Sequence, residues 1–285
     1  MENEAELGIV RRAYAKQVMA AAMLDDERVE AAFAAVRREA YLGPGPWPVL
    51  RTQPDGYVPT PSDNPVYLYV NQVVGLLTER NLNNGEPSLH AMMIGSAALK
   101  HGEHAVHIGV GVGYYTAILA ELVGATGRIT AIELDAELAE RAAANLAGLR
   151  HVCVLHGNGA LIPFDPADVI YVNAGATRPA DVWLDRLNEN GRLILPLTAS
   201  EFPNTDFRKG AVFRITRQGQ DFLVKRISAV GIFPCEGMRD PDSEAALAAA
   251  FERGRVEEVT RLYHRDDVPD EDCWVRGKGW WLAYH

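Results

Sequence analysis

The sequence lacks the features that mark secreted, membrane-spanning or metal-binding proteins. Its three cysteines, Cys153, Cys235 and Cys273, are an odd number, are widely spaced and form no CxxC pair, which argues against a disulfide framework and a zinc site. The first residues, MENEAELGIVRRAYAKQ, carry charges where a signal peptide needs an apolar segment, and no later apolar run has the length of a membrane span. We therefore expect a soluble, cytoplasmic protein with no metal site and no membrane contact.

Positive charge is also scarce. The chain has 28 Lys and Arg residues against 38 Asp and Glu residues, a formal net charge of −10. A broad nucleic-acid surface needs clustered Lys and Arg, so nucleic acid is a disfavoured partner. With 285 residues and a hydrophobic fraction of 48%, the chain can build one large α/β core with appendages.

The first third of the chain contains three segments with different sequence patterns. Helical spacing of Val29, Phe33 and Val36 predicts helices between residues 6 and 40, the second of them capped by Asp25 or Asp26. The stretch 42–65 holds seven of the sixteen prolines, which excludes a regular helix or a central strand and predicts an extended wrap. A strand within residues 66–77 and a helix from near Ser88 should follow.

From His104 onward, apolar segments alternate with helical ones, which predicts a mostly parallel sheet with helices on both faces. The predicted strands are 104–109, 128–133, 151–155, 167–173 and 191–197, and the predicted helices are 114–122, 136–147 and 179–187. Two strand-like runs around Gln218-Gly219 then predict an antiparallel hairpin. A helix over 243–252 and an aromatic tail with Trp274, Trp280 and Trp281 end the chain. We expect the tail to dock on its own domain or to form a dimer contact rather than to bind a peptide.

The stretch AVHIGVGVGYYTAIL carries the first functional signal. Gly109, Gly111 and Gly113 form a GxGxG turn, whereas a dinucleotide-binding fingerprint needs a glycine where Tyr114 stands. Glu133 ends the next predicted strand, twenty residues after Gly113. S-adenosylmethionine (SAM) needs close backbone approach at its methionine portion and a carboxylate for its ribose hydroxyls. The pattern therefore favours a SAM site; the alternative, a tight turn followed by a solvated glutamate, stays open.

The segment from about Val29 to Pro196 resembles the protein-L-isoaspartate O-methyltransferases, SAM-dependent enzymes that methylate the abnormal α-carboxylate of isoaspartyl sites. The resemblance lies in the stretches DDERVEAAFAAVRREAYL, PSLHAMMI, IGVGVGYYTAILAELVGATGRITAIE, HGNGA, FDPADVIYVNAGA and LNENGRLILPL. It implies a Rossmann-like class I methyltransferase fold, α/β, with a mostly parallel sheet and an antiparallel C-terminal hairpin. We divide the chain into N-terminal helices and a proline-rich wrap (1–87), a SAM-binding core (88–235) and a C-terminal extension (236–285).

The resemblance also implies roles for individual residues. Gly109, Gly111, Val112 and Gly113 would line the methionine end of SAM, and Glu133 would hold its ribose. Asn158, followed by Gly159, takes the place of an aspartate that receives the adenine amino group, and its amide carbonyl can still accept that hydrogen bond; a simple turn role for Asn158 is the alternative. Asn173 would line the methyl-transfer crevice. His90 either faces that crevice or is a boundary histidine of its helix.

Two positions depart from the family pattern. His107 replaces an acidic residue before the glycine turn, and a neutral imidazole cannot supply the same fixed negative charge. Gly85 stands in the slot of a serine that, in the family, sits at the reacting carboxylate. We therefore expect weak repair of isoaspartyl peptides, and we expect the Gly85→Ser variant to raise it if the surrounding loop keeps the conformation of the family.

The favoured function is O-methylation of a carboxylate in a peptide or protein, with SAM as the methyl donor and with an altered substrate preference. An RNA methyltransferase, a small-molecule methyltransferase and a non-catalytic SAM-binding protein are the alternatives. The catalytic residues are not identified, and a homodimer is a possible assembly.

Overall fold

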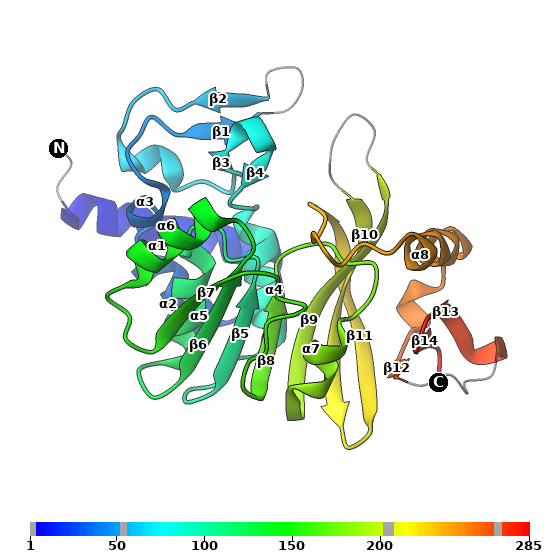
Figure 1. Cartoon of the computed structure of the whole chain (residues 1–285). Coiled ribbons are helices and arrows are strands. Elements are labelled where there is room, and N and C mark those ends of the chain that lie inside the picture. Colours follow the sequence, from blue (N-terminus) through cyan, green and yellow to red (C-terminus); the bar gives the residue numbers. More distant parts are fainter. Residues whose placement is uncertain (1–3, 52–55, 202–207, 265–269) are drawn as a thin grey trace. The chain divides into compact units, whose positions relative to one another are not determined.

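The computed structural model describes residues 4–51, 56–201, 208–264 and 270–285 (Figure 1). The chain forms two compact units that interleave along the sequence: residues 1–102 with 110–156, and residues 103–109 with 157–285. Gly109 therefore ends a segment of the second unit, and Val110 begins a segment of the first. The sequence-based division at residues 87 and 235 stays a prediction.

Three helices begin the first unit: α1 (Glu4–Ala22), α2 (Glu27–Ala35) and α3 (Glu39–Leu42). Asp26 caps α2 as predicted, because its side chain accepts hydrogen bonds from the backbone N–H groups of Arg28 and Val29. Val29, Phe33 and Val36 are buried, which confirms the predicted apolar face. Helix α1 packs against α2 and against α4 (Pro87–Ala97).

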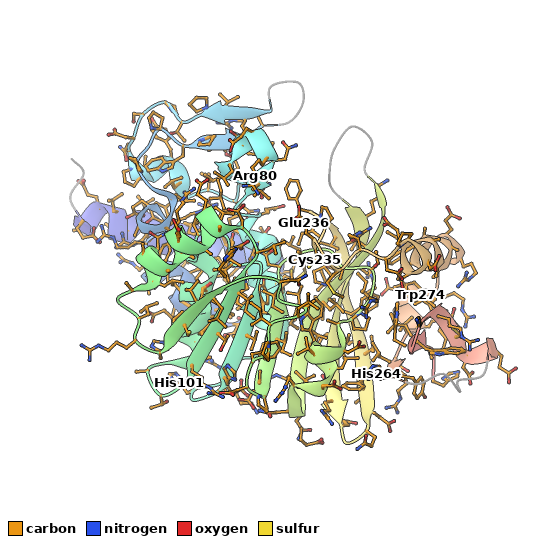
Figure 2. All side chains as sticks on the ribbon, in the orientation of Figure 1. Arg80, His101, Cys235, Glu236, His264 and Trp274 are labelled. Carbon is orange, nitrogen blue, oxygen red and sulfur yellow. The ribbon has the colours of Figure 1, made fainter. Side chains whose placement is uncertain are left out.

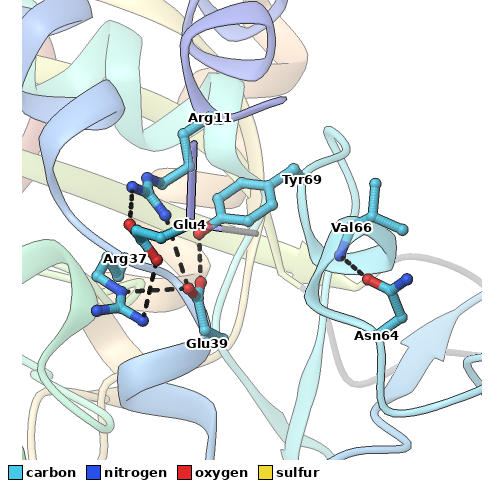
Figure 3. Close-up of polar contacts among 7 residues, drawn as sticks. All are labelled: Glu4, Arg11, Arg37, Glu39, Asn64, Val66 and Tyr69. Carbon is cyan, nitrogen blue, oxygen red and sulfur yellow. Dashed lines mark hydrogen bonds and ion pairs between the residues drawn. The ribbon is translucent and has the colours of Figure 1, made fainter. Parts of the chain in front are cut away.

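Charged side chains connect α1 to the start of α3. Arg11 forms ion pairs with Glu4 (2.5 Å) and Glu39 (3.8 Å), and Arg37 reaches the same two carboxylates at 3.5 and 3.4 Å (Figure 3). The Tyr69 hydroxyl donates a hydrogen bond to Glu39. Burial and this carboxylate raise the pKa of Tyr69, so the phenol stays protonated and continues to donate.

Short ribbons form in the proline-rich stretch and in the segment after it. Apart from Leu42, the last residue of α3, the described residues of the stretch (43–51 and 56–65) contain no regular α-helix or central strand, as predicted. Strand β1 (Pro48–Leu50) pairs with β2 (Tyr57–Pro59), and β3 (Gly75–Leu77) pairs with β4 (Leu82–Asn83). Two 3₁₀ turns, η1 (Pro65–Leu68) and η2 (Thr78–Arg80), connect these ribbons. The strand expected within residues 66–77 is β3 at the end of that range, whereas residues 65–68 form η1, which Asn64 caps by accepting a hydrogen bond from the Val66 N–H (3.0 Å; Figure 3).

The first unit also contains α5 (Tyr114–Val123), β6 (Arg128–Glu133), α6 (Ala136–Leu146) and β7 (Val152–His156). Strands β6 and β7 are parallel, and α6 packs against both. Strand β6 agrees with its prediction residue for residue. Asp135 caps α6 by accepting a hydrogen bond from Leu138 N–H. Helix α6 therefore begins directly after Glu133, the last residue of β6.

The second unit contains a sheet with the strand order β13-β14-β12-β11-β10-β9-β8-β5. Its strands are β5 (His104–Ile108), β8 (Ala167–Val172), β9 (Leu187–Glu201), β10 (Arg208–Gln218), β11 (Asp221–Ile232), β12 (Arg261–Tyr263), β13 (Cys273–Gly277) and β14 (Trp280–Ala283). The pairs β5–β8 and β8–β9 are parallel, and the later pairs are antiparallel. The predicted parallel core and C-terminal hairpin are thus confirmed.

Helices α7 (Asp181–Asp185) and α8 (Pro241–Arg253) accompany this sheet, with two 3₁₀ turns, η3 (Val256–Glu258) and η4 (Asp270–Asp272). The tail forms strands of its own unit: Trp274, labelled in Figure 2, packs edge-on against Phe251 of α8 (5.2 Å between ring centroids). All three tail tryptophans are buried. Within the described part of the chain, the helices are too short or too polar to cross a membrane.

Candidate functional site

The glycine turn has a backbone shape that side chains would not permit. Gly109, Gly111 and Gly113 have φ angles of +79°, +60° and +93°, in the region where glycine carries no steric penalty. A Cβ atom on Gly113 would come within 2.8 Å of a Leu146 methyl group. The turn therefore needs glycine at this position, and it leads directly into α5 with Gly113 as its N-cap.

Glu133 points back at this turn from the end of β6. Its Oε2 atom accepts a hydrogen bond from Gly111 N–H at 2.7 Å, and its Oε1 atom accepts one from Asp135 N–H at 3.0 Å. Burial raises the pKa of Glu133, and the backbone N–H groups of Asp135, Gly111 and Leu134 oppose that rise. A carboxylate oxygen has two lone pairs, so both oxygens can accept further hydrogen bonds, such as those of ribose hydroxyls.

Two further side chains were not recognised in the sequence: one holds the turn, and the other pairs with the N-cap residue of α6. Asn145 of α6 donates to the Val112 carbonyl at 2.9 Å and to the Tyr41 carbonyl at 3.1 Å. Arg80 pairs with Asp135 at 2.5 Å. Isolated polar residues carry no sequence signal that identifies such partners. The Val112 side chain is fully buried in an apolar cluster, so a ligand could reach this residue through its backbone alone.

In the second unit, Asn173 lies against the first glycine of the turn. Its Nδ2 atom donates to the Gly109 carbonyl at 3.1 Å, and its backbone N–H donates to Ile108 at 2.8 Å. A Cβ atom on Gly109 would come within 3.1 Å of the Asn173 carbonyl oxygen. Asn173, which the sequence analysis predicted as a crevice residue, thus holds Gly109 against the end of β8.

Asn158 and Gly159 follow β7 in the sequence and belong to the second unit. The Oδ1 atom of Asn158 accepts a hydrogen bond from Ala160 N–H at 2.9 Å, as expected for an asparagine that stabilises a turn. One lone pair of this oxygen stays available to a ligand. A Cβ atom on Gly159 would lie 2.6 Å from an Ile108 methyl group, and the Gly159 carbonyl accepts from Trp183 Nε1 at 2.9 Å. Gly159 therefore allows its loop to approach β5 closely.

His107 is fully buried in the middle of β5, and its ring meets Tyr171 edge-on with 5.1 Å between centroids. Burial lowers the pKa of His107 to about 3. The imidazole is therefore neutral at physiological pH, in agreement with the expectation that it supplies no charge near the glycine turn.

The segment before α4 brings three residues of the first unit together. Gly85 has φ = +71°, and its N–H donates to the Asn83 side chain at 2.8 Å. The imidazole of His90 stacks on the ring of Tyr115, with 3.4 Å between centroids and 6° between planes. The Tyr115 hydroxyl in turn donates to the Gly85 carbonyl at 3.4 Å.

Residues 49–229 match the family model described as "Protein-L-isoaspartate(D-aspartate) O-methyltransferase (PCMT)". The chain belongs to this family. A protein-L-isoaspartate O-methyltransferase of Rhodopseudomonas palustris is 31% identical over 83% of this chain and 98% of its own length. One of Ignicoccus hospitalis is 33% identical over 52% of this chain and 69% of its own length.

Two solved structures have the same fold. A protein-L-isoaspartate O-methyltransferase superimposes with a TM-score of 0.64 at 20% identity, over 90% of this chain and 74% of the other. A putative family member from Plasmodium falciparum, in complex with S-adenosyl-L-homocysteine, has a TM-score of 0.62 at 18% identity, over 79% and 98%. As a family member, the chain is a SAM-dependent methyltransferase.

The structure does not support our expectation that Gly85→Ser raises activity in this family member. A Cβ atom on residue 85 would lie 2.3 Å from His90 Nε2, well inside van der Waals contact. The positive φ angle of Gly85 adds strain for any other residue. A serine at position 85 would therefore require the His90 ring to shift.

Proposed function

We propose that this chain transfers a methyl group from SAM to a carboxylate of isoaspartyl-containing peptides or proteins. The hydrogen bond from Gly111 N–H to the buried Glu133 carboxylate carries the proposal, because it joins the glycine turn and the acidic strand end in one arrangement. We assign Gly111, Gly113, the Val112 backbone and Glu133 of the first unit to SAM. Gly109, Asn158 and Gly159 belong to the second unit, and their assignment to SAM rests on the resemblance alone.

SAM, when bound, supplies a methyl group that a nucleophile can accept. A carboxylate has a reference pKa of about 4 and is already ionised at neutral pH, so the chain needs no general base. Its residues act by holding the carboxylate oxygen in line with the methyl group. Positioning of this kind can contribute about 7 to 11 kcal/mol in favourable cases.

Weak activity on standard isoaspartyl peptides and an altered preference among peptide and protein substrates are part of the proposal. Gly85 supports them, because it offers no hydroxyl at the position that the resemblance assigns to a serine. Intact Gly111–Glu133 geometry argues that SAM binding is kept while acceptor recognition differs.

The test combines calorimetry with methyl-transfer assays on an isoaspartyl peptide and on its normal aspartyl counterpart. We expect saturable SAM binding, and methylation of the isoaspartyl peptide above that of the aspartyl one. The Glu133→Ala variant should bind SAM about ten- to a hundredfold more weakly, since hydrogen bonds to a charged group contribute roughly 1.5 to 3 kcal/mol.

Glu137→Ala is the matched control, because Glu137 is an exposed carboxylate of α6 in the same unit. Its SAM affinity should equal that of the parent. An unchanged affinity in Glu133→Ala would contradict the ribose assignment. Absence of SAM binding in the parent would contradict the proposed function, and methylation of RNA or of a small molecule alone would replace it.

A further inference from the structure

Positively charged side chains gather on one face of the sheet in the second unit. Successive residues of a strand point to opposite faces of its sheet. In β10, Arg214 is partly exposed, whereas its neighbours Phe213 and Ile215 are fully buried. In β11, Lys225 is exposed and the preceding Val224 is buried. Arg214 and Lys225 therefore lie on the solvent-facing side of the sheet.

The strand register brings a third cation to this side. Strands β9, β10 and β11 run next to one another (Figure 1), and β12 pairs with β11. Arg214 is directly opposite Lys225, and Leu223, two residues before Lys225, is directly opposite Arg261 of β12. Residues directly opposite have Cβ atoms about 5 Å apart, and diagonal neighbours are about 7 to 8 Å apart. We call Arg214, Lys225 and Arg261 the cationic face.

The cationic face lacks compensating acids. Among the residues that the structure describes, its three side chains form no hydrogen bond or ion pair with a carboxylate. Arg192 of β9, on the same side of the sheet, is by contrast paired with both oxygens of Glu103 at 2.9 and 2.8 Å. Burial and, to a smaller extent, the charge of Arg192 lower the pKa of Arg214. Like charges opposite each other destabilise a sheet, so an anion bound here would relieve a repulsion.

A shortage of acidic residues does not explain this arrangement. The chain has ten more Asp and Glu than Lys and Arg residues, and Arg226, the next residue of β11, is paired with Glu257 at 2.6 Å. On the side of the cationic face, Asp221 begins β11. It is four residues from Lys225, about 13 Å along an extended strand. The positive charge of the cationic face is therefore local and exposed to solvent at Lys225.

We propose that the cationic face binds an extended acidic segment of a partner protein, in which acidic residues stand at alternate positions. Alternate side chains of an extended segment project on the same side about 7 Å apart, which matches the diagonal spacing of Lys225 and Arg261. A nucleic acid is disfavoured, because three cations on a chain of net charge −10 offer little to a continuous row of phosphates. The inference is independent of the proposed function, since none of the three residues is assigned to SAM.

The experiment measures fluorescence anisotropy of a fluorescein-labelled peptide in which glutamate and threonine alternate. We expect saturable binding to the full chain that weakens as salt is added, and weaker binding of a peptide of the same composition whose glutamates are contiguous. Lys225→Gln should lower the affinity about two- to fivefold, the effect of one exposed ion pair. Combining it with Arg261→Gln should lower the affinity further.

Lys278→Gln is the matched control, because Lys278 is an exposed lysine in the turn between β13 and β14 and its replacement changes the net charge equally. Its peptide affinity should equal that of the parent. Melting temperatures of all variants show whether each one is folded. Lys225 is exposed and makes no ion pair with a described residue, so its variant should melt with the parent.

Several results would overturn the inference: no binding of the alternating peptide to the parent, equal losses in Lys225→Gln and Lys278→Gln, or tighter binding of the contiguous peptide. Tighter binding of a single-stranded oligonucleotide, weakened by Lys225→Gln, would replace the acidic protein segment by a nucleic acid. Calorimetric binding of SAM should be the same in all variants, so failure here leaves the proposed function standing.

Discussion

At the scale of single residues, the fold changes the chemistry of His107 and Glu133 in different ways. Both side chains are buried, and burial disfavours the charged form of each. His107 responds by staying neutral. Glu133 keeps three backbone N–H groups around its carboxylate, which partly offset burial. The two residues differ because of their positions. Glu133 is the last residue of β6 and lies beside the glycine turn, whose backbone N–H groups it can reach, whereas His107 lies within strand β5.

His107 should make the folded state less stable in mild acid. Its pKa is lowered to about 3 in the folded protein, against about 6.5 in the unfolded chain. Below pH 6.5 the unfolded chain takes up a proton that the folded protein does not bind, so this residue's contribution to stability is present above that pH. It falls by at most about 1.4 kcal/mol per pH unit down to the folded pKa.

Urea unfolding of the parent and of His107→Gln at pH 7.5 and pH 5.5 measures this contribution. The loss of unfolding free energy between the two pH values should be smaller in the variant, which lacks the titrating group. Equal losses in both proteins would show that His107 is not the source.

At the scale of secondary-structure elements, Arg38 holds the segment between η1 and β3. It is fully buried between α2 and α3, and its guanidinium donates to the carbonyls of Leu68 (2.6 Å), Val70 (3.1 Å) and Gln72 (2.9 Å). The same segment carries Asn71, which holds the start of α4. A buried guanidinium thus connects the N-terminal helices to the segment that holds the start of α4.

Replacing Arg38 by methionine should destabilise the protein by about 3 to 5 kcal/mol, because it leaves buried carbonyl groups without their donors. Arg37→Met is the control: the Arg37 side chain is 55% exposed, and exposed ion pairs contribute about 0 to 1 kcal/mol. Thermal and urea unfolding give both values. A loss below 1 kcal/mol in Arg38→Met would contradict the structural role.

At the scale of the second unit, the C-terminal tail supplies the last two strands of the sheet. Strand β14 pairs with β12 and with β13, and Trp274 donates from Nε1 to the Gly254 carbonyl at 2.9 Å while Arg253 donates to the Trp274 carbonyl at 2.5 Å. Helix α8 packs against β13. The tail is therefore part of the unit's core rather than an appendage.

Truncation after Asp272 should lower the melting temperature and promote aggregation, because it exposes the apolar surface under Trp274 and leaves β12 as an open edge. Trp274→Ala in the full chain should cost about 3 to 5 kcal/mol through the cavity that it creates. Differential scanning calorimetry and light scattering compare the forms. A truncated protein that is as stable and soluble as the parent would show that the tail serves recognition instead.

Across the whole molecule, sequence reasoning located the strands, helices and glycine turn well and was less successful with short elements. Strand β6 was predicted to the residue, whereas α7 is five residues long against nine predicted, and the strand expected within residues 66–77 is confined to Gly75–Leu77. Long periodic segments carry many concordant signals, while short ones depend on a single cap or turn. The homodimer, the cytoplasmic location and the domain division stay predictions.

The sequence by itself determined the class of the protein, because alternating strand and helix patterns, three glycines at alternate positions and an acid at the next strand end are local features. Tertiary structure decided which side chains meet: His90 in the space beside Gly85, Asn173 on Gly109, and Arg38 on three carbonyls. Each of these contacts depends on the distance and angle between separate segments once packed. A hydrophobic pattern specifies which face of a segment is buried. It does not specify which polar groups meet on that face, because that depends on how the segments pack.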